Sequence, residues 1–417
     1  MSKKALILSF DLIRKKELEI PLAIASLLAY LKQDERYGID FMVEHQSVNM
    51  WIMKNRVDVA YLEHVLSPYP LQNYDTIAIS CYVWNEYVIH PLCQLLRSYG
   101  FRGKLVLGGY QISYGNEQQL PIDYPEGNIF ISGYAEASLL EAILMDKPSK
   151  PVFLDMKVEM DNIPSAYLSG ELPVKQGQSM LRWETKRGCP YNCTFCAHRD
   201  LTRKKLYQQQ SDKVFAELEF FKSRAVGRVN VLDPIFNVGK DFMMHLMQIQ
   251  ELKMDTQFTL QTRLEMIRGD KGELFLDLVA EVNAHLEIGL QTIIEAEYEV
   301  VNRKNNVERV AAMIKELNTR GISYEVSLIY GLPNQTIDSF QRSLDFLHDL
   351  DCKEIKAFPL MLLKGTELFN QKEKYGLVEK VLGDFNIPTV VAGNSFSEDD
   401  WWQMQSMAEG LMPVHRL

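Results

Sequence analysis

Three cysteines on one short segment are the residues whose spacing most directly predicts chemistry. Cys189, Cys193 and Cys196 follow the pattern C-x₃-C-x₂-C within the sequence RGCPYNCTFC. Thiolates are soft donors that favour iron–sulfur clusters or zinc. Because the three lie on one loop, they can converge on a single metal centre. In a chain without a secretory pattern, clustered thiols predict metal ligands or catalytic groups rather than disulfides.

Zinc is the main alternative to an iron–sulfur cluster. A structural zinc site needs four ligands. His198 is close, but no second distant pair of ligands completes a standard finger. A cubane cluster held by three cysteines instead leaves one iron open for another ligand. The pattern therefore favours a 4Fe–4S cluster, and a zinc-stabilised binding protein without catalytic activity is the alternative of a different class.

The composition is that of a globular protein with more than one domain. The chain has 417 residues, of which 47% are hydrophobic and 24% charged, and its net charge is −10. Such a charge creates no overall positive field for nucleic acid or an anionic membrane. The longest apolar run, residues 21–31, is shorter than the about 20 residues of a membrane helix. The first residues lack a signal-peptide pattern. We therefore expect a cytoplasmic protein that binds neither membrane nor nucleic acid.

The first 147 residues alternate strand-like and helix-like segments. Apolar runs predict strands at 4–10, 41–44, 76–81, 104–107 and 129–132, and a helical pattern begins at Pro21. This alternation predicts a parallel, doubly wound, Rossmann-like α/β domain. Ligands of such sheets bind beyond the carboxyl ends of the strands. In this chain those ends carry Asp11, Ser80, Gly108, Gly109 and Gly133.

The remainder of the chain predicts a linker, a second α/β domain and a tail. Residues 148–180 are punctuated by prolines and predict a linker. Residues 181–384 contain six strand candidates, each followed by a helical pattern: 181–185, 228–232, 257–261, 285–291, 324–329 and 354–360. Six such units are too few for the closed eight-unit barrel and predict a partial (βα)₆ TIM barrel. Residues 385–417 predict a C-terminal tail with a short amphipathic helix.

The second domain resembles the radical S-adenosylmethionine (SAM) superfamily. Besides the cysteine motif with its aromatic Phe195, three segments are similar to family motifs in family order: HLEIGLQT at 285–292, LIYGLP at 328–333, and 359–366 with its Gly-Thr. The resemblance implies that the three cysteines hold a 4Fe–4S cluster whose open iron binds SAM. An electron from the cluster would then cleave SAM to a 5′-deoxyadenosyl radical.

The resemblance also implies which residues contact SAM. Phe195 and the backbone around residues 329–331 and 360–361 are expected near the adenine. The family's glycine-rich second-strand motif is replaced by VNVLDPIFN, so Asp233 is a candidate, with capping or packing as its alternative role. Arg263 could meet the SAM carboxylate through a charge-assisted bond or form a surface ion pair. The SAM-binding candidates are Phe195, Asp233, Arg263, Glu287, Gln291, Ile329, Gly331 and Met361.

The first domain resembles the cobalamin-binding domain of radical SAM enzymes. The segments PLAIASLLAYL, IAISCYVWN, LVLGGYQIS and SGYAEASL carry the resemblance. A bulky corrin needs glycine turns for close backbone approach. The D-x-H-x-x-G loop is absent, so no histidine of that motif ligates cobalt from below. Structural turns and a buried aromatic core are the alternative roles. The cobalamin-binding candidates are Asp11, Ser80, Tyr82, Trp84, Asn85, Gly108, Gly109, Gly133 and Glu136.

Together these resemblances imply a cobalamin-dependent radical SAM enzyme, in the first place a C-methyltransferase. In the family scheme one SAM methylates cob(I)alamin, and a second supplies the radical that abstracts hydrogen from an unactivated carbon, which then takes the methyl group from methylcobalamin. A small-molecule or peptide substrate and an external one-electron reductant of flavodoxin or ferredoxin type are implied as partners. The alternative is a radical SAM enzyme that catalyses a rearrangement, cyclisation or redox reaction, with or without cobalamin. The sequence names no catalytic base.

Overall fold

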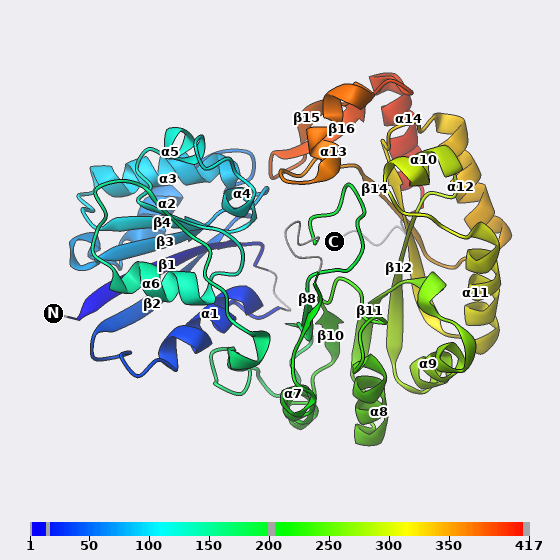
Figure 1. Ribbon diagram of the computed structural model, residues 1–417, viewed down its shortest axis with the longest axis horizontal. Coiled ribbons are helices and arrows are strands. Elements are labelled where there is room, and N and C mark those ends of the chain that lie inside the picture. Colours follow the sequence, from blue (N-terminus) through cyan, green and yellow to red (C-terminus); the bar gives the residue numbers. More distant parts are fainter. Residues whose placement is uncertain (1, 14–16, 199–204, 412–417) are drawn as a thin grey trace. The chain divides into compact units, whose positions relative to one another are not determined.

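The chain folds into two compact units, each built around a parallel sheet (Figure 1). The computed structural model describes residues 2–13, 17–198 and 205–411. Unit 1 comprises Met1–Val174 and Leu382–Ile387, and unit 2 comprises Lys175–Val381 and Pro388–Leu417. No described helix is both long and apolar enough to cross a membrane.

Unit 1 is a six-stranded, fully parallel sheet with strand order β2-β1-β3-β4-β5-β6. Its strands are β1 (Lys3–Asp11), β2 (Phe41–Asn49), β3 (Thr76–Ser80), β4 (Lys104–Gly108), β5 (Ile129–Ile131) and β6 (Val152–Leu154). Its helices are α1 (Leu22–Lys32), α2 (Val59–Leu66), α3 (Glu86–Ser98), α4 (Tyr110–Ser113), α5 (Leu120–Asp123) and α6 (Glu136–Leu144), with 3₁₀ turns at Leu71–Asn73 and Met160–Asn162. This arrangement confirms the predicted doubly wound fold class.

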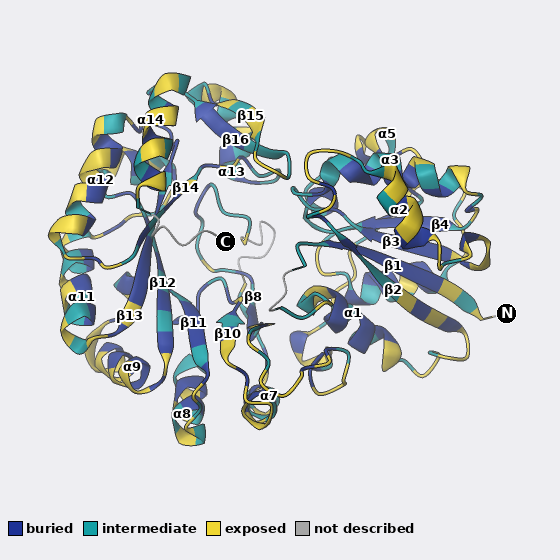
Figure 2. Cartoon of the chain, turned by 180° about the vertical axis from the view of Figure 1, so that it is seen from behind, coloured by how far each residue is buried: buried dark blue, intermediate teal, exposed yellow. Residues whose placement is uncertain are grey.

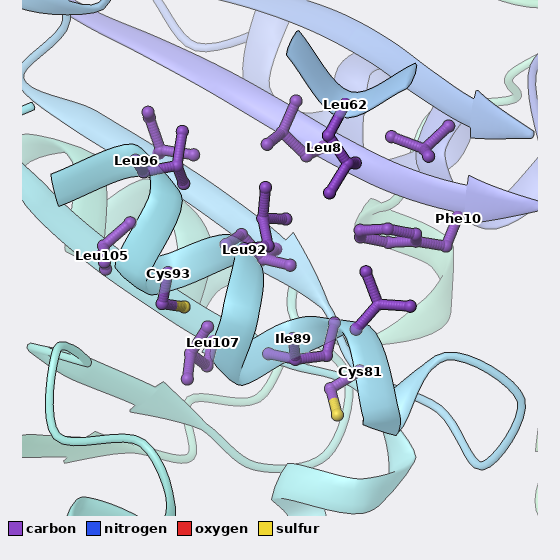
Figure 3. Packing of buried hydrophobic residues seen from close by; sticks show 14 of the residues in the cluster. Leu8, Phe10, Leu62, Cys81, Ile89, Leu92, Cys93, Leu96, Leu105 and Leu107 are labelled. Atoms are coloured by element: carbon purple, nitrogen blue, oxygen red, sulfur yellow. The ribbon is translucent and has the colours of Figure 1, made fainter. Parts of the chain in front are cut away.

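Each face of this sheet has its own hydrophobic core, because successive strand residues point to opposite faces. Leu8 belongs to one core with Leu62 of α2 and Leu92 of α3 (Figure 3). The neighbouring Ile7 belongs to the other core, with Leu28 of α1. Burial on both faces explains why the strands read as continuous apolar runs in the sequence.

The structure differs from the sequence prediction in the segment expected to be a linker. Residues 152–154 form β6, which extends the sheet of unit 1 by pairing in parallel with β5. Unit 1 accordingly continues to Val174. The strand has only three residues and follows Pro151, so it is too short to show a periodic pattern.

Unit 2 contains six parallel strands in the order β14-β13-β12-β11-β10-β7. Only β7 and β14 have a single neighbour in this sheet, so the barrel is open. Its strands are β7 (Leu181–Trp183), β10 (Arg228–Val231), β11 (Gln257–Thr262), β12 (Ala284–Gln291), β13 (Ser323–Tyr330) and β14 (Ile355–Pro359). All six lie within or overlap the predicted segments, and the predicted partial barrel is confirmed.

Helices follow the barrel strands and cover their outer face, where the strands are mostly buried (Figure 2). The helices of unit 2 are α7 (Ser211–Ser223), α8 (Phe242–Leu252), α9 (Gly269–Glu281), α10 (Glu295–Val300), α11 (Val307–Arg320), α12 (Ile337–Asp349), α13 (Glu367–Asn370) and α14 (Glu398–Glu409), with 3₁₀ turns at Leu264–Met266 and Lys372–Tyr375. Two short strand pairs complete the fold: β8 (Lys186–Arg187) pairs with β9 (Tyr207–Gln208) in antiparallel direction, and β15 (Val378–Leu382) pairs with β16 (Ile387–Ala392). The second pair lies partly within the predicted tail, where the sequence analysis expected only a helix.

Candidate active site

The cysteine loop follows β8 and is fastened to the rest of unit 2 by its backbone. Thr194 donates from its backbone N–H to the Val301 carbonyl at 3.0 Å and from its hydroxyl to the Val300 carbonyl at 3.1 Å. The Leu368 N–H donates to the Thr194 carbonyl at 3.0 Å. Gly188 starts the loop at φ +80°, and a Cβ there would collide with the Lys205 carbonyl oxygen. The loop is therefore held between the end of α10 and the start of α13.

The three thiols fit a multi-iron cluster better than a single zinc ion. Cys193 is buried and the other two are half-buried. Burial raises the pKa of Cys189 and brings that of Cys196 to about 11. A structural zinc site needs four ligands, whereas a cubane cluster held by three cysteines leaves one iron open for another ligand.

Arg303 is a charged residue of this site that the sequence analysis missed. Its Nη1 lies 4.0 Å from Cys193 Sγ, and its Nη2 donates to the Gly289 carbonyl of β12. Its Nε is buried and has no hydrogen-bond partner among the described residues. Because a guanidinium is always charged, the side chain places a permanent positive charge beside the cysteines. No sequence motif marks this arginine; it follows α10 in a segment without a family signature.

Two predicted SAM contacts lie on the half-buried face of β12. The strand alternates strictly between buried and half-buried residues, and Glu287 and Gln291 are on the half-buried face. Burial and the nearby Glu325 raise the pKa of Glu287. Gln291 has φ +69°, and its buried Oε1 has no hydrogen-bond partner in the described part of the chain. An acceptor without a partner at a strand end is available to a ligand.

The remaining barrel candidates occupy neighbouring segments. Phe195 and Ile329 are half-buried, and Met361 is 39% exposed. Gly331 has φ +85°, and a Cβ there would touch the indole of Trp401 at 3.4 Å. Glycine is therefore suited to this turn both by its backbone conformation and by the packing of α14 behind it.

The geometry of Asp233 favours the packing role. The carboxyl is fully buried and accepts bonds from the Thr185 N–H at 2.7 Å, the Thr185 hydroxyl at 2.5 Å and the Lys186 N–H at 2.9 Å. Burial raises the pKa of Asp233 to about 6. These bonds join the segment after β7 to the end of β10, so Asp233 orients the strand that leads into the cysteine loop.

Arg263 lies beside the cysteine loop but is already paired. Its guanidinium stacks over the Tyr191 ring at 3.8 Å and bonds the Glu265 carboxylate at 2.6 Å. The Asn237 side chain also holds the Arg263 backbone at 2.9 and 3.0 Å. Arg263 therefore forms an ion pair and also lies near the loop. Arg303 has fewer of its guanidinium nitrogens engaged in bonds among the described residues.

In unit 1 the cobalamin candidates gather at the carboxyl edge of the sheet. Strand order reverses between β1 and β3, and ligands of doubly wound sheets bind at such a point. Asp11 ends β1 and Ser80 ends β3. Beyond β3 the rings of Tyr82 and Trp84 stack at 4.6 Å, and both residues are half-buried. This edge offers a flat aromatic surface and polar groups, which fits a large planar ligand.

Other candidates at this edge have evident structural roles. The Asn85 side chain is fully buried, accepting from the Tyr82 N–H at 2.6 Å and donating to the Ser80 carbonyl at 2.8 Å. Gly109 has φ +97°, and a Cβ there would lie 2.6 Å from the Cys81 carbonyl oxygen. Gly133 has a positive φ of +71°. A Cβ added at Gly108 would make only ordinary van der Waals contacts. Glu136 is buried in the first turn of α6. The bonds of Asn85 thus hold the turn after β3 from within.

Comparison with known proteins identifies the barrel. Residues 183–347 match the radical SAM superfamily. The matched radical SAM region begins at Trp183 in β7 and ends at Leu347 in α12, so it includes the cysteine loop, β12 and β13.

Curated relatives align with residues of both units. The chain is 22% identical over 398 residues to the cobalamin-dependent radical SAM methyltransferase TokK of Streptomyces tokunonensis, covering 86% of this chain and 56% of that protein. It is also 22% identical over 391 residues to the 2-(S-pantetheinyl)-carbapenam-3-carboxylate methyltransferase of Streptantibioticus cattleyicolor, covering 82% and 57%. The chain therefore spans a little more than half the length of these curated relatives.

Solved structures agree in fold along nearly the whole chain. The radical SAM methyltransferase TsrM from Kitasatospora setae, with cobalamin and a [4Fe–4S] cluster bound, superimposes with a TM-score of 0.71 at 13% identity, covering 99% of this chain and 90% of that one. The cobalamin-dependent radical enzyme OxsB gives 0.70 at 13% identity, covering 97% and 66%. The fold of both units is therefore shared with these two proteins.

Proposed function

We propose that this protein is a cobalamin-dependent radical SAM enzyme that methylates a carbon atom of a small substrate. One observation carries the proposal: three thiols spaced for a cluster lie on a loop of an open radical SAM barrel, in a chain that also contains a doubly wound domain. The names of the relatives TokK and the carbapenam methyltransferase support methyl transfer as the reaction.

The residues of unit 2 can be assigned complementary roles. A 4Fe–4S cluster on Cys189, Cys193 and Cys196 would supply the electron that splits SAM, and cobalamin would carry the methyl group. Arg303 is our candidate for binding the SAM carboxylate, because its Nε has no hydrogen-bond partner among the described residues. Gln291 is our candidate for binding a hydroxyl or amino group, because its Oε1 also lacks a partner there. A charge-assisted bond from a buried guanidinium is stronger than a neutral one, so Arg303 would contribute most of the orientation.

The residues of unit 1 suit cobalamin in a different way. The half-buried ring pair Tyr82–Trp84 offers a flat surface, and Asp11 and Ser80 offer polar groups at the sheet's switch point. Gly108 leaves room for a ligand, since a Cβ there would meet only Ile131 atoms at 3.6 Å and beyond. Asn85 fixes the turn after β3, and Gly109 lets the turn after β4 pack closely against the Cys81 backbone. We assign them to positioning rather than to direct contact.

Partners follow from the chemistry. Radical SAM cleavage consumes one electron, so we propose an external one-electron reductant of flavodoxin or ferredoxin type. The substrate would be a small molecule or peptide. A non-methylating radical reaction remains the second candidate, and it would leave the role of the three cysteines unchanged.

Anaerobic reconstitution with iron and sulfide, followed by hydroxocobalamin, SAM and a chemical reductant, tests the proposal without knowledge of the substrate. We expect about four irons per chain for one cubane cluster, a corrin absorbance band that stays with the protein, and cobalamin-dependent formation of S-adenosylhomocysteine. Iron and 5′-deoxyadenosine without bound corrin would favour the non-methylating alternative. Stoichiometric zinc without iron would overturn both. The matched control is the variant with Cys189, Cys193 and Cys196 all replaced by alanine.

A further inference from the structure

A buried polar network joins the loops that follow β12 and β13. Glu297 of α10 and Gln335, which precedes α12, are both fully buried. The Gln335 Nε2 donates to Glu297 Oε2 at 3.2 Å and to the Ile329 carbonyl at 3.1 Å. Its Oε1 accepts from the backbone N–H of Gly331 at 2.7 Å and of Leu332 at 3.2 Å. The amide therefore holds both sides of the turn that follows β13.

Glu297 holds the other end of the network. Its Oε2 accepts from the Thr292 hydroxyl at 2.5 Å, just beyond β12, and its Oε1 accepts from the Ser339 hydroxyl. Ser339 is also part of the capping box that starts α12 with Thr336. One carboxylate thus joins the end of β12, helix α10 and the start of α12.

Fold stability alone does not account for this carboxylate. Burying a carboxylate among neutral donors is costly compared with packing apolar groups of the same shape. In the part of the chain that the structure describes, no ion pair involves Glu297; its partners are hydroxyls and an amide. A fully satisfied buried network does, however, select one arrangement of the segments that it joins. The segments joined here are those that the proposed function places around SAM.

The same helix also reaches the cysteine loop. The last residue of α10, Val300, and the following Val301 accept the two hydrogen bonds from Thr194. Helix α10 therefore connects the cysteine loop at its carboxyl end with the Glu297 network on its buried side.

We propose that Glu297 and Gln335 are positioning residues, which hold the turn at Gly331–Leu332 and the end of β12 in the arrangement that binds SAM. The inference rests on the proposed function and adds two residues that would act on SAM affinity without touching the cluster.

The first test is Gln335→Leu in the reconstituted full-length protein. Leucine has a similar size but forms none of the four hydrogen bonds. We expect iron content to stay at the wild-type level and the dissociation constant for SAM, measured by isothermal titration, to rise at least about tenfold, as for the loss of one or two buried hydrogen bonds. The control is Leu344→Val, which removes one buried methylene from α12, the helix that Gln335 precedes, without touching the network.

The second test separates positioning from simple destabilisation. In Gln335→Glu two carboxyl groups would face each other, and such a pair shares a proton when the pH is lowered. The protonated carboxyl can again donate to Glu297, whose other neighbours are the hydroxyls of Thr292 and Ser339 and the more distant cation Arg342. We expect SAM affinity relative to wild type to be near normal at pH 6 and weakened at pH 8.

The outcomes are distinguishable. Wild-type affinity in Gln335→Leu, or an equal loss of affinity in Leu344→Val, would overturn the positioning role. If Gln335→Leu fails to fold, the test rests on Gln335→Glu. The positioning role would then be overturned if the SAM affinity of this variant relative to wild type did not change between pH 6 and pH 8. A wild-type protein that holds iron but does not bind SAM would contradict the proposed function itself.

Discussion

The guanidinium of Arg303 and the thiol of Cys193 lie side by side, with Nη1 4.0 Å from Sγ. The same guanidinium bonds the Gly289 carbonyl, where the pairing of β12 with β13 is irregular between Gly289 and Gln291. One side chain therefore connects the cysteine loop to the strand that carries Gln291. Since the charge is permanent, it acts on any anionic group that binds between these elements.

Replacing Arg303 by glutamine should weaken SAM binding about 10- to 100-fold, because a hydrogen bond to a charged group contributes about 1.5–3 kcal/mol. Iron content should be retained. Isothermal titration of reconstituted protein with SAM measures the effect. Arg263→Gln is the matched comparison, since Arg263 also lies at the cysteine loop but is paired with Glu265. A larger loss in Arg263→Gln would restore Arg263 as the carboxylate ligand.

Replacing any one of Cys189, Cys193 and Cys196 by alanine should abolish nearly all bound iron, because three thiolates are the whole protein ligand set of the predicted cluster. Iron and sulfide analysis after anaerobic reconstitution provides the measurement. Cys352→Ala is the control, because Cys352 lies in unit 2 and is buried but bonds the Glu354 carbonyl rather than joining the loop. Retention of iron in all three single variants would contradict the ligand assignment.

Gly109→Ala should destabilise unit 1 and reduce its cobalamin loading, whereas Gly108→Ala should be tolerated. At Gly109 the positive φ of +97° and the close Cys81 carbonyl both oppose a side chain. Strain of this kind costs roughly 1–3 kcal/mol. At Gly108 a Cβ would meet only ordinary contacts. The unfolding temperatures of the two variants are compared with that of the wild type. Equal decreases in both variants would show that the turn after β4 is less constrained than its geometry indicates.

The free energy of unfolding should fall as the pH is lowered from about 6.5 to 4, in part through His245. Burial lowers the pKa of His245 to about 4, and neither ring nitrogen has a hydrogen-bond partner among the described residues. Below pH 6.5 the unfolded chain takes up a proton that the folded imidazole does not, so unfolding becomes easier. Lowering the pKa of His245 from 6.5 to about 4 changes the free energy of unfolding by at most about 3 kcal/mol over this pH range.

His245→Leu should therefore flatten this pH dependence, as measured by urea unfolding of the metal-free protein at several pH values. The same substitution at His348, which is exposed on α12, is the control. Identical pH profiles for His245→Leu and wild type would show that His245 is not responsible.

The sequence by itself determined the fold class, the six barrel strands and the three cysteines. Each of those features depends on residues that are close together in the sequence. A parallel strand buried on both faces is an apolar run, and the cysteine motif occupies eight consecutive residues. The same locality explains why β6 was missed, because three residues after a proline form a strand only when β5 supplies the neighbouring hydrogen bonds.

Only the tertiary structure decided which side chains meet. Arg303 contacts Cys193 across 110 residues of sequence, and Gln335 contacts Glu297 across 38. Neither pair has a local signal, since each depends on how two βα units pack in the barrel. The roles of Asp233 and Asn85 were likewise open in the sequence, because a polar residue at a strand end suits a ligand or a turn equally well. Their complete burial and hydrogen bonds to neighbouring backbone favour the turn, because a side chain whose bonding groups are already engaged within the fold is less available to a ligand.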